Sequence, residues 1–134
     1  MKVVFDTNVL IAAFLTEGLC SKLLIRARKG NLELVLSDDI IKEFETVLRK
    51  KIKLSVQEIL DARTILKEAT KEIIQKVNPI KPICRDKSDN KILACALATN
   101  ADYLVTGDED LLIMKQYGIS RIISPKEFES LFAE

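Results

Sequence analysis

Short apolar runs and longer helical patterns alternate along this chain. Four of the runs lack polar alternation, which is typical of strands buried on both faces of a parallel sheet. They begin near Val3, Glu33, Tyr103 and Arg121. A fifth, weaker strand is predicted near Ile73, where two prolines follow and indicate a sheet edge. Strands that alternate with helices in this way predict an α/β fold built on a parallel sheet.

Between these runs, apolar positions recur at the spacing of helices that bury one face. Ser37, Ser55 and Ser124 each stand where a helix should begin, and the last two have the capping-box glutamate three residues later. Gly30 marks the end of a further helix. The predicted helices cover residues 9–15, 21–30, 38–50, 55–70, 85–98 and the stretch from 125 onward.

Composition and length indicate a single globular domain over residues 1–134. Apolar residues make up 48% of the chain and charged residues 31%, and no boundary or repeat interrupts it. The formal net charge is +1, so contact with nucleic acid requires a local patch. The basic run at 49–53 is either such a patch or a solvated surface. No apolar run reaches membrane-spanning length and no signal peptide precedes the first strand, so we expect a cytoplasmic protein without membrane contact.

The absence of histidine limits the chemistry that is available to this chain. Ser–His and Cys–His catalysis are excluded, and so are metal sites with imidazole ligands. The three cysteines form no Cys-x-x-Cys pair and suit buried positions in a reducing compartment better than disulfides or zinc sites. Carboxylates, hydroxyls, lysines and arginines remain as the reactive groups.

Acidic residues follow two of the predicted strands. Asp6 comes directly after the first strand, while Asp108 and Asp110 follow the strand near Tyr103. Both stretches continue into an apolar helix start, and Asn8 occupies the position in the first stretch that Asp110 has in the second. Because the carboxyl ends of parallel strands carry the ligand sites of α/β sheets, the two loops are candidate parts of one site. The alternative for Asp6 is a local Asx turn.

Two predicted helices add further acidic candidates. Asp89 lies on the buried side of its helix, although an aspartate in the first turn can simply cap a helix. Asp86 is the better candidate for a plain cap or a supporting residue. On the helix after the second strand, Glu43 and Glu45 flank the apolar stripe on opposite sides. Periodicity therefore leaves open which glutamate, if either, faces a site.

These carboxylates converge if right-handed crossovers place the acidic strand ends on one side of the sheet. Three or four carboxylates within a few ångströms repel one another and require a cation. Oxygen ligands favour Mg²⁺ or Mn²⁺ over zinc or copper. Such ions activate water against phosphodiesters, so the residues by themselves predict metal-assisted phosphodiester hydrolysis.

Four motifs, in order, resemble those of PIN-domain ribonucleases. They are Phe5-Asp6-Thr7-Asn8-Val9-Leu10, Ser37-x-x-Ile40-x-x-Glu43, Arg85-Asp86-x-x-Asp89-Asn90-x-Ile92-Leu93 and Val105-Thr106-Gly107-Asp108-x-Asp110-Leu111. The resemblance extends from residue 1 to about residue 132. It is closest to the small prokaryotic branch of toxins from toxin–antitoxin pairs, similar to VapC-type toxins.

The resemblance implies a three-layer PIN-like domain with a five-stranded parallel sheet of order 3-2-1-4-5 between helices. It favours Glu43 over Glu45 and leaves the division of labour between Asp108 and Asp110 open. It also implies Mg²⁺- or Mn²⁺-dependent endoribonuclease activity on RNA, a homodimer and, for a toxin, a cognate antitoxin protein. The implied residues are catalytic and metal-binding Asp6, Glu43, Asp89 and Asp108, the further metal ligand Asp110, and the supporting residues Asn8, Thr106 and Asp86.

Two other functions fit parts of the same pattern. An aspartyl-phosphate phosphatase would use Asp6 as a covalent nucleophile, but such enzymes carry a second aspartate two residues on, where this chain has Asn8. The other is a catalytically inactive PIN module that binds RNA or protein. Such a module would not need all four acidic positions, and all four are filled.

Overall fold

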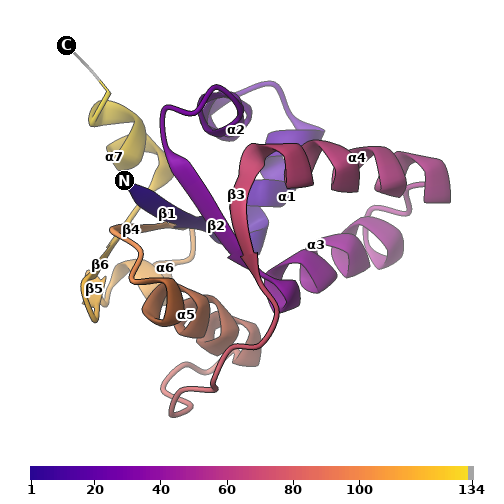
Figure 1. Cartoon of the computed structure of the whole chain (residues 1–134). Helices are drawn as coiled ribbons and strands as arrows, with labels where there is room; N and C mark the ends of the chain where they lie inside the picture. Colours follow the sequence, from indigo (N-terminus) through magenta and orange to yellow (C-terminus); the bar gives the residue numbers. More distant parts are fainter. Residues whose placement is uncertain (133–134) are drawn as a thin grey trace.

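The computed structural model describes residues 1–132, and this part of the chain contains six strands and seven helices. The strands are β1 (Lys2–Phe5), β2 (Glu33–Ser37), β3 (Thr70–Ile74), β4 (Tyr103–Val105), β5 (Gln116–Tyr117) and β6 (Ser120–Ile123). The helices are α1 (Thr7–Leu15), α2 (Leu19–Arg28), α3 (Asp38–Lys50), α4 (Val56–Ala69), α5 (Lys87–Thr99), α6 (Glu109–Leu112) and α7 (Pro125–Ser130) (Figure 1).

All six strands belong to one sheet, in the order β3-β2-β1-β4-β6-β5. β1 pairs in parallel with β2 on one side and with β4 on the other. The five longer strands are all parallel, which confirms the order 3-2-1-4-5 that the resemblance implied. The sixth strand, β5, was not predicted. It is only two residues long and pairs antiparallel with β6 across a turn in which Gly118 has a φ of +58°.

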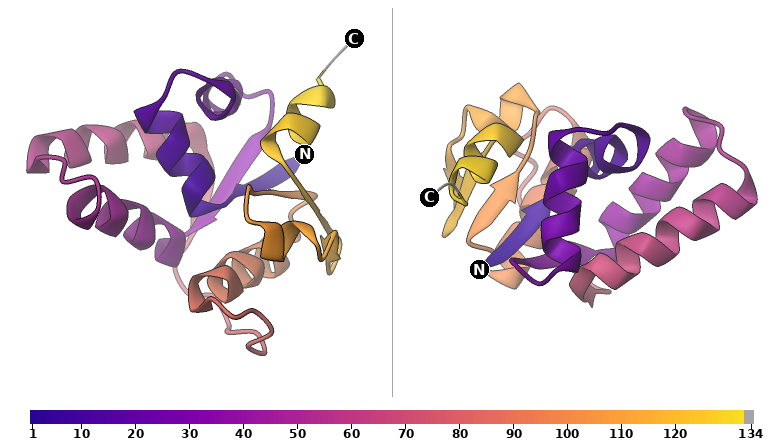
Figure 2. Two further views of the ribbon diagram at one scale, coloured as in Figure 1. Left: turned by 180° about the vertical axis from the view of Figure 1, so that it is seen from behind. Right: turned by 90° about the horizontal axis from the view of Figure 1, so that it is seen from above.

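Helices cover both faces of this sheet (Figures 1 and 2). α5 packs against β1 and β2 on one face, while α1, α2 and α7 lie on the other. α3 and α4 pack against each other as a hairpin that extends beyond the β3 edge. The arrangement therefore has the three layers that the resemblance implied.

The central strands are buried, as their apolar runs predicted. Val3, Val4 and Phe5 of β1 and Leu34 and Leu36 of β2 have no exposed surface. Burial of a large apolar side chain contributes about 1.5–3 kcal/mol to folding. The burial of β1 therefore fixes its position in the fold, and with it the position of the polar residues that follow Phe5.

The helices begin at the predicted caps or close to them. Ser37, Ser55 and Ser124 each accept a hydrogen bond from the N–H three residues later, and the last two complete capping boxes. α1 begins at Thr7 and α2 at Leu19, two residues earlier than predicted in both cases. The N–H groups of a first turn need no partner within the helix, so this turn tolerates residues outside the apolar pattern.

Membrane-spanning segments are not evident in the part of the chain that the structure describes. No single helix there is long and apolar enough to cross a bilayer. α1 and α2 have the required length and composition only as a pair, and a bend of 98° separates them.

An aromatic cluster holds α7 against the rest of the fold. The ring of Phe128 is fully buried, and its centroid lies 6.3 Å from that of Phe5, 5.8 Å from Tyr103 and 5.3 Å from Phe132. α7 has only six residues, and isolated helices of that length are not stable in water. Its position therefore depends on packing rather than on helix propensity.

We expect Phe128→Ala to lower the free energy of unfolding by about 3–5 kcal/mol, because the truncation leaves a cavity among three rings. Urea denaturation measures the loss. Leu131→Ala is the matched control, since Leu131 is 48% exposed, and it should change stability by only about 0.5 kcal/mol. Equal losses in the two variants would contradict the role given to Phe128.

Candidate active site

Three carboxylates meet at the carboxyl ends of β1 and β4. Asp6 directly follows β1, Asp108 follows β4, and Asp89 lies in the first turn of α5, which packs against β1. One oxygen from each carboxylate lies within 4.8 Å of the other two. Asp6 and Asp89 are each only 4% exposed, and Asp108 is half-buried. The structure therefore brings these three candidate residues together, and we call them the acidic cluster.

Thr106 links the two acidic loops. Its hydroxyl donates to Asp6 Oδ2 at 2.6 Å and accepts the N–H of Asp108 at 3.0 Å. The side chain of Asp6 makes no capping hydrogen bond of good geometry to α1, although the N–H groups of Thr7 and Asn8 help to lower its pKa. Burial raises the pKa of Asp6 above its ordinary value, against the lowering effect of the Thr106 hydrogen bond, and the charge of Asp108 raises it further.

Asp89 is the most perturbed acid of the cluster. Its Oδ2 atom is buried and has no hydrogen-bond partner among the described residues. Burial, followed by the neighbouring carboxylates of Asp108 and Asp6, raises the pKa of Asp89 to about 7. The cap of α5 is instead Asp86, which accepts hydrogen bonds from the N–H and the hydroxyl of Ser88. The helix start therefore leaves Asp89 free to face the cluster.

Glu43 and Glu45 have different environments, although both are on α3. Glu45 is paired with Arg63 of α4, whose Nε lies 2.6 Å from Glu45 Oε1. Glu43 is half-buried, and its pKa is raised first by burial and then by the negative charge of Asp6. Glu43 thus stands beside the acidic cluster without belonging to its closest group, and Glu45 is held elsewhere.

Asp110 and Asn8 do not join the acidic cluster. The N–H of Asp110 donates to Asp108 Oδ1 at 2.9 Å, while its own carboxylate accepts hydrogen bonds from Arg85 Nη2 at 2.8 and 2.9 Å. Asn8 is exposed. In this structure Asp108, and not Asp110, contributes its carboxylate to the acidic cluster, and Asp110 supports Asp108 through its backbone N–H.

Two residues near the site were quoted in the motifs but not singled out by sequence reasoning. Thr7 is 1% exposed, and its hydroxyl lies close enough to Glu43 to lower the pKa of that carboxyl, without a hydrogen bond of good geometry. Arg85 pairs with Asp110 across 25 positions of sequence. A threonine after an acidic strand end and an arginine before a helix cap are both common, so no periodicity distinguished them.

The donor set of the acidic cluster fits a hard divalent cation. It contains only carboxylate oxygens, which Mg²⁺ and Mn²⁺ prefer, and the unpaired Oδ2 of Asp89 is an atom that a cation would satisfy. Asp6, Asp89 and Asp108 would hold the ion. Thr106 would orient Asp6 from behind, as the outer partners of metal ligands do.

Comparison with known proteins decides the family. A family model that describes the PIN domain matches residues 2–110. The chain belongs to the PIN domain family. Its fold is similar to a chain in the crystal structure of VapBC2 from Rickettsia felis bound to a DNA fragment from their promoter, with a TM-score of 0.65 and 18% identity over 92% of this chain and 98% of that one. Among curated proteins, none matches this PIN domain at a significant level.

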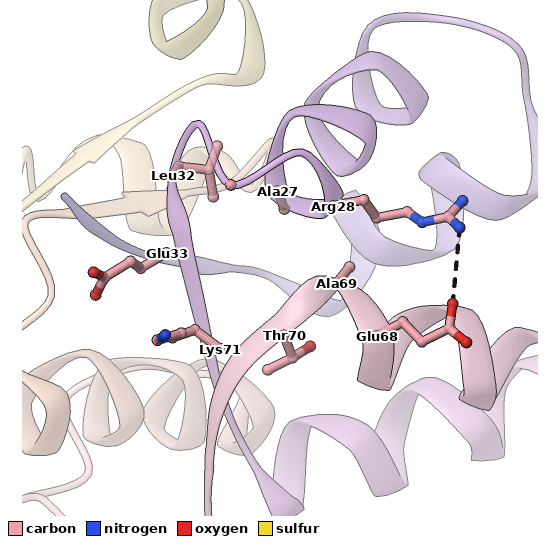
Figure 3. A pocket seen from close by; sticks show the side chains of 9 residues that line it. Ala27, Arg28, Leu32, Glu33, Glu68, Ala69, Thr70 and Lys71 are labelled. Carbon is pink, nitrogen blue, oxygen red and sulfur yellow. Dashed lines mark ion pairs between the residues drawn. The ribbon is translucent and has the colours of Figure 1, made fainter.

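A pocket at the opposite end of the sheet offers different chemistry. It has a volume of about 330 Å³ and lies where β2 and β3 begin, lined by Glu33 and Thr70 (Figure 3). Arg28 and Glu68 form an ion pair of 3.8 Å at this pocket, and Lys71 adds a second basic group. Two basic and two acidic side chains line this pocket, so it lacks the concentrated negative charge that a divalent cation requires. The acidic cluster therefore remains the candidate active site of this PIN domain.

We expect the metal-free PIN domain to become more stable as the pH falls from neutral toward mildly acidic values. The folded-state pKa of Asp89 is about 7, above its ordinary 3.8, so the folded state binds more protons between these two values. The contribution is fully present below 3.8 and is lost as the pH rises through about 7. Thermal melting in chelator across this pH range measures it.

Asp89→Asn isolates this effect, because it removes one charge from the cluster without opening a cavity. In chelator at neutral pH the variant should be more stable than wild type by about 1 kcal/mol, and its melting should depend less on pH. It should also gain less stability from added Mn²⁺, since a bound ligand stabilises by mass action. A variant that melts lower than wild type and responds equally to Mn²⁺ would place Asp89 in a purely structural role.

Proposed function

We propose that this PIN domain is a divalent-metal-dependent endoribonuclease that hydrolyses RNA phosphodiester bonds. The observation that carries the proposal is the acidic cluster itself, in which Asp6, Asp89 and Asp108 approach within 4.8 Å at the carboxyl ends of β1 and β4. A buried, unpaired oxygen of Asp89 adds to it. Membership of the PIN domain family supports the same conclusion.

Some residues of this chain would bind the cation, and Glu43 would hold a proton or orient a water molecule. Asp6, Asp89 and Asp108 provide carboxylate oxygens, and the hydroxyl of Thr106 keeps Asp6 oriented toward the other two. When bound, Mg²⁺ or Mn²⁺ supplies an activated water and neutralises the charge that develops on the phosphate. Glu43 stands half-buried beside Asp6, where its raised pKa suits it to hold a proton or to orient a water.

We also infer a cellular role as the toxin of a toxin–antitoxin pair, acting on RNA in the cytoplasm. The support is the likeness in fold to VapBC2 from Rickettsia felis, together with the four motifs that resemble VapC-type toxins. A cognate antitoxin protein is then the expected partner, and a homodimer is the expected assembly.

RNA cleavage by this PIN domain should depend completely on a divalent ion. On a mixed pool of single-stranded and structured RNA, excess chelator should abolish cleavage, and added Mg²⁺ or Mn²⁺ should restore it, because the cluster needs a cation to neutralise it. Gel analysis of the products measures both steps. Undiminished cleavage in chelator would rule out the metal mechanism.

Two further outcomes of this assay would point to the rival functions. RNA binding without any cleavage in Mn²⁺ would indicate an inactive PIN module. A phosphoenzyme trapped on Asp6 with a small phosphate ester would indicate an aspartyl-phosphate phosphatase.

Glu43→Gln should reduce the rate of cleavage by about a hundredfold, because it removes the carboxylate beside Asp6 while preserving its shape. Glu45→Gln on the same helix is the matched control. It weakens the pair with Arg63 and so affects stability, but below its melting temperature it should cleave RNA at nearly the wild-type rate. The opposite result for the two variants would show that the wrong glutamate has been assigned.

A further inference from the structure

We propose that Arg85 binds a phosphate of the RNA backbone at the edge of the acidic cluster, and that it exchanges its ion pair with Asp110 for this contact. The proposal rests on the ribonuclease function proposed above and names a residue that contacts the substrate. Arg85 Nη2 donates to both carboxylate oxygens of Asp110, at 2.8 and 2.9 Å. Asp110 in turn donates its N–H to Asp108, so the guanidinium lies one residue away from the cluster.

The backbone on both sides of Arg85 is anchored. On one side, the N–H of Cys84 donates to Asn90 Oδ1 at 3.0 Å. On the other, Asp86 caps α5 through the N–H of Ser88 at 2.9 Å. Both anchors tie the segment to the same helix that carries Asp89. Arg85 is therefore presented from a fixed base.

The guanidinium of Arg85 is nevertheless available to bind a ligand. It is 87% exposed, and only one of its three nitrogen atoms is used in the pair with Asp110. Arginine has five N–H donors in a planar fork that matches the oxygens of a phosphate. Most of these donors point to no partner among the described residues, so they are available to a ligand.

Stability does not account for the Arg85–Asp110 pair. An ion pair at this exposure contributes little to stability, so it can be broken at small cost. A polyanionic substrate, by contrast, needs positive charge close to the cluster, because three carboxylates repel its backbone and the net charge of the chain is only +1. A phosphate satisfies Arg85 as well as Asp110 does and brings the RNA to the site.

A second basic residue, Lys51, acts on the charge of Asp86, the residue that caps α5. Lys51 belongs to the basic run at 49–53 and is the C-cap residue that follows α3. Hydrogen bonds from Ser88 hold the pKa of Asp86 below its ordinary value, and the charge of Lys51 lowers it further. Lys51 therefore adds positive charge near the start of α5, the helix that carries Asp89.

The test compares wild type with Arg85→Ala, Arg85→Lys and the control Arg28→Ala. Arg28 also belongs to an exposed ion pair, with Glu68, but at the opposite end of the sheet (Figure 3). Affinity for a fluorescent single-stranded RNA is measured by anisotropy in chelator at several salt concentrations. KM and kcat are measured with Mn²⁺, and melting temperatures show whether each variant is folded.

Arg85→Ala should weaken RNA binding and raise KM by about tenfold, the scale of one charge-assisted hydrogen bond, with a smaller change in kcat. The slope of log affinity against log salt should become shallower by about 0.7, as for one lost phosphate contact on a single strand. Arg85→Lys should recover part of the affinity, since lysine keeps the charge without the fork. Arg28→Ala should match wild type in RNA affinity, in the salt dependence of that affinity and in KM.

Arg85→Ala could weaken RNA binding because a phosphate contact is lost or because the Asp110 carboxylate is left unpaired and repels the RNA. Asp110→Asn distinguishes these two explanations. In this background Arg85→Ala leaves no new negative charge, and it should still weaken RNA binding. If Arg85→Ala has no effect there, or matches Arg28→Ala in the wild-type background, Arg85 serves only to pair Asp110 and the proposal is overturned. If wild type binds RNA but does not cleave it with Mn²⁺, the proposed ribonuclease function fails, while the binding comparison in chelator still decides the role of Arg85.

Discussion

The parallel pairing of β1 with β4 is the constraint on which the whole site depends. Phe5 lies opposite Val105, and the N–H of Asp6 donates to the carbonyl of Val105 at 2.9 Å. This register places the residues that follow the two strands next to each other, within reach of the Thr106 hydroxyl. A slip of one residue would turn every side chain of the strand to the other face and separate the two acidic loops.

Once the carboxylates are held together, they need a counter-charge, and a proton competes with a cation for that role. The raised pKa of Asp89 shows that a proton can take this role in the metal-free protein, and a cation would compete for the same oxygens. Metal ligands of this kind must be deprotonated to bind, so the affinity of the cluster for a cation should fall as the pH drops. A cation held by the acidic cluster would therefore be released as the pH falls.

Much of this fold could be predicted from the sequence because its signals are local and strong. The buried runs of β1 and β2 and the caps Ser37, Ser55 and Ser124 determine where most elements lie, and the parallel strand order follows the family motifs. β5 could not be predicted, since two residues in a turn carry no pattern.

Only part of the candidate site could be predicted from the sequence, and the reason is different. Asp6, Asp89 and Asp108 stand at strand ends and on a buried helix face, which are positions that a pattern can identify. Periodicity could not choose between Glu43 and Glu45, and only the family resemblance favoured Glu43. The pairing of Glu45 with Arg63 and of Asp110 with Arg85 was not predicted. These partners come from distant parts of the chain, so only the three-dimensional structure places them.

The two edges of the sheet have a consequence for how copies of this chain can associate. At one edge, β5 covers β6 with only two residues, and at the other, β3 exposes the charged residues Lys71 and Glu72. Short edge strands and charged edge residues both oppose the pairing of strands between molecules, and with it the growth of aggregated sheets. Self-association of this protein should therefore use its helical surfaces and leave the sheet discontinuous between subunits.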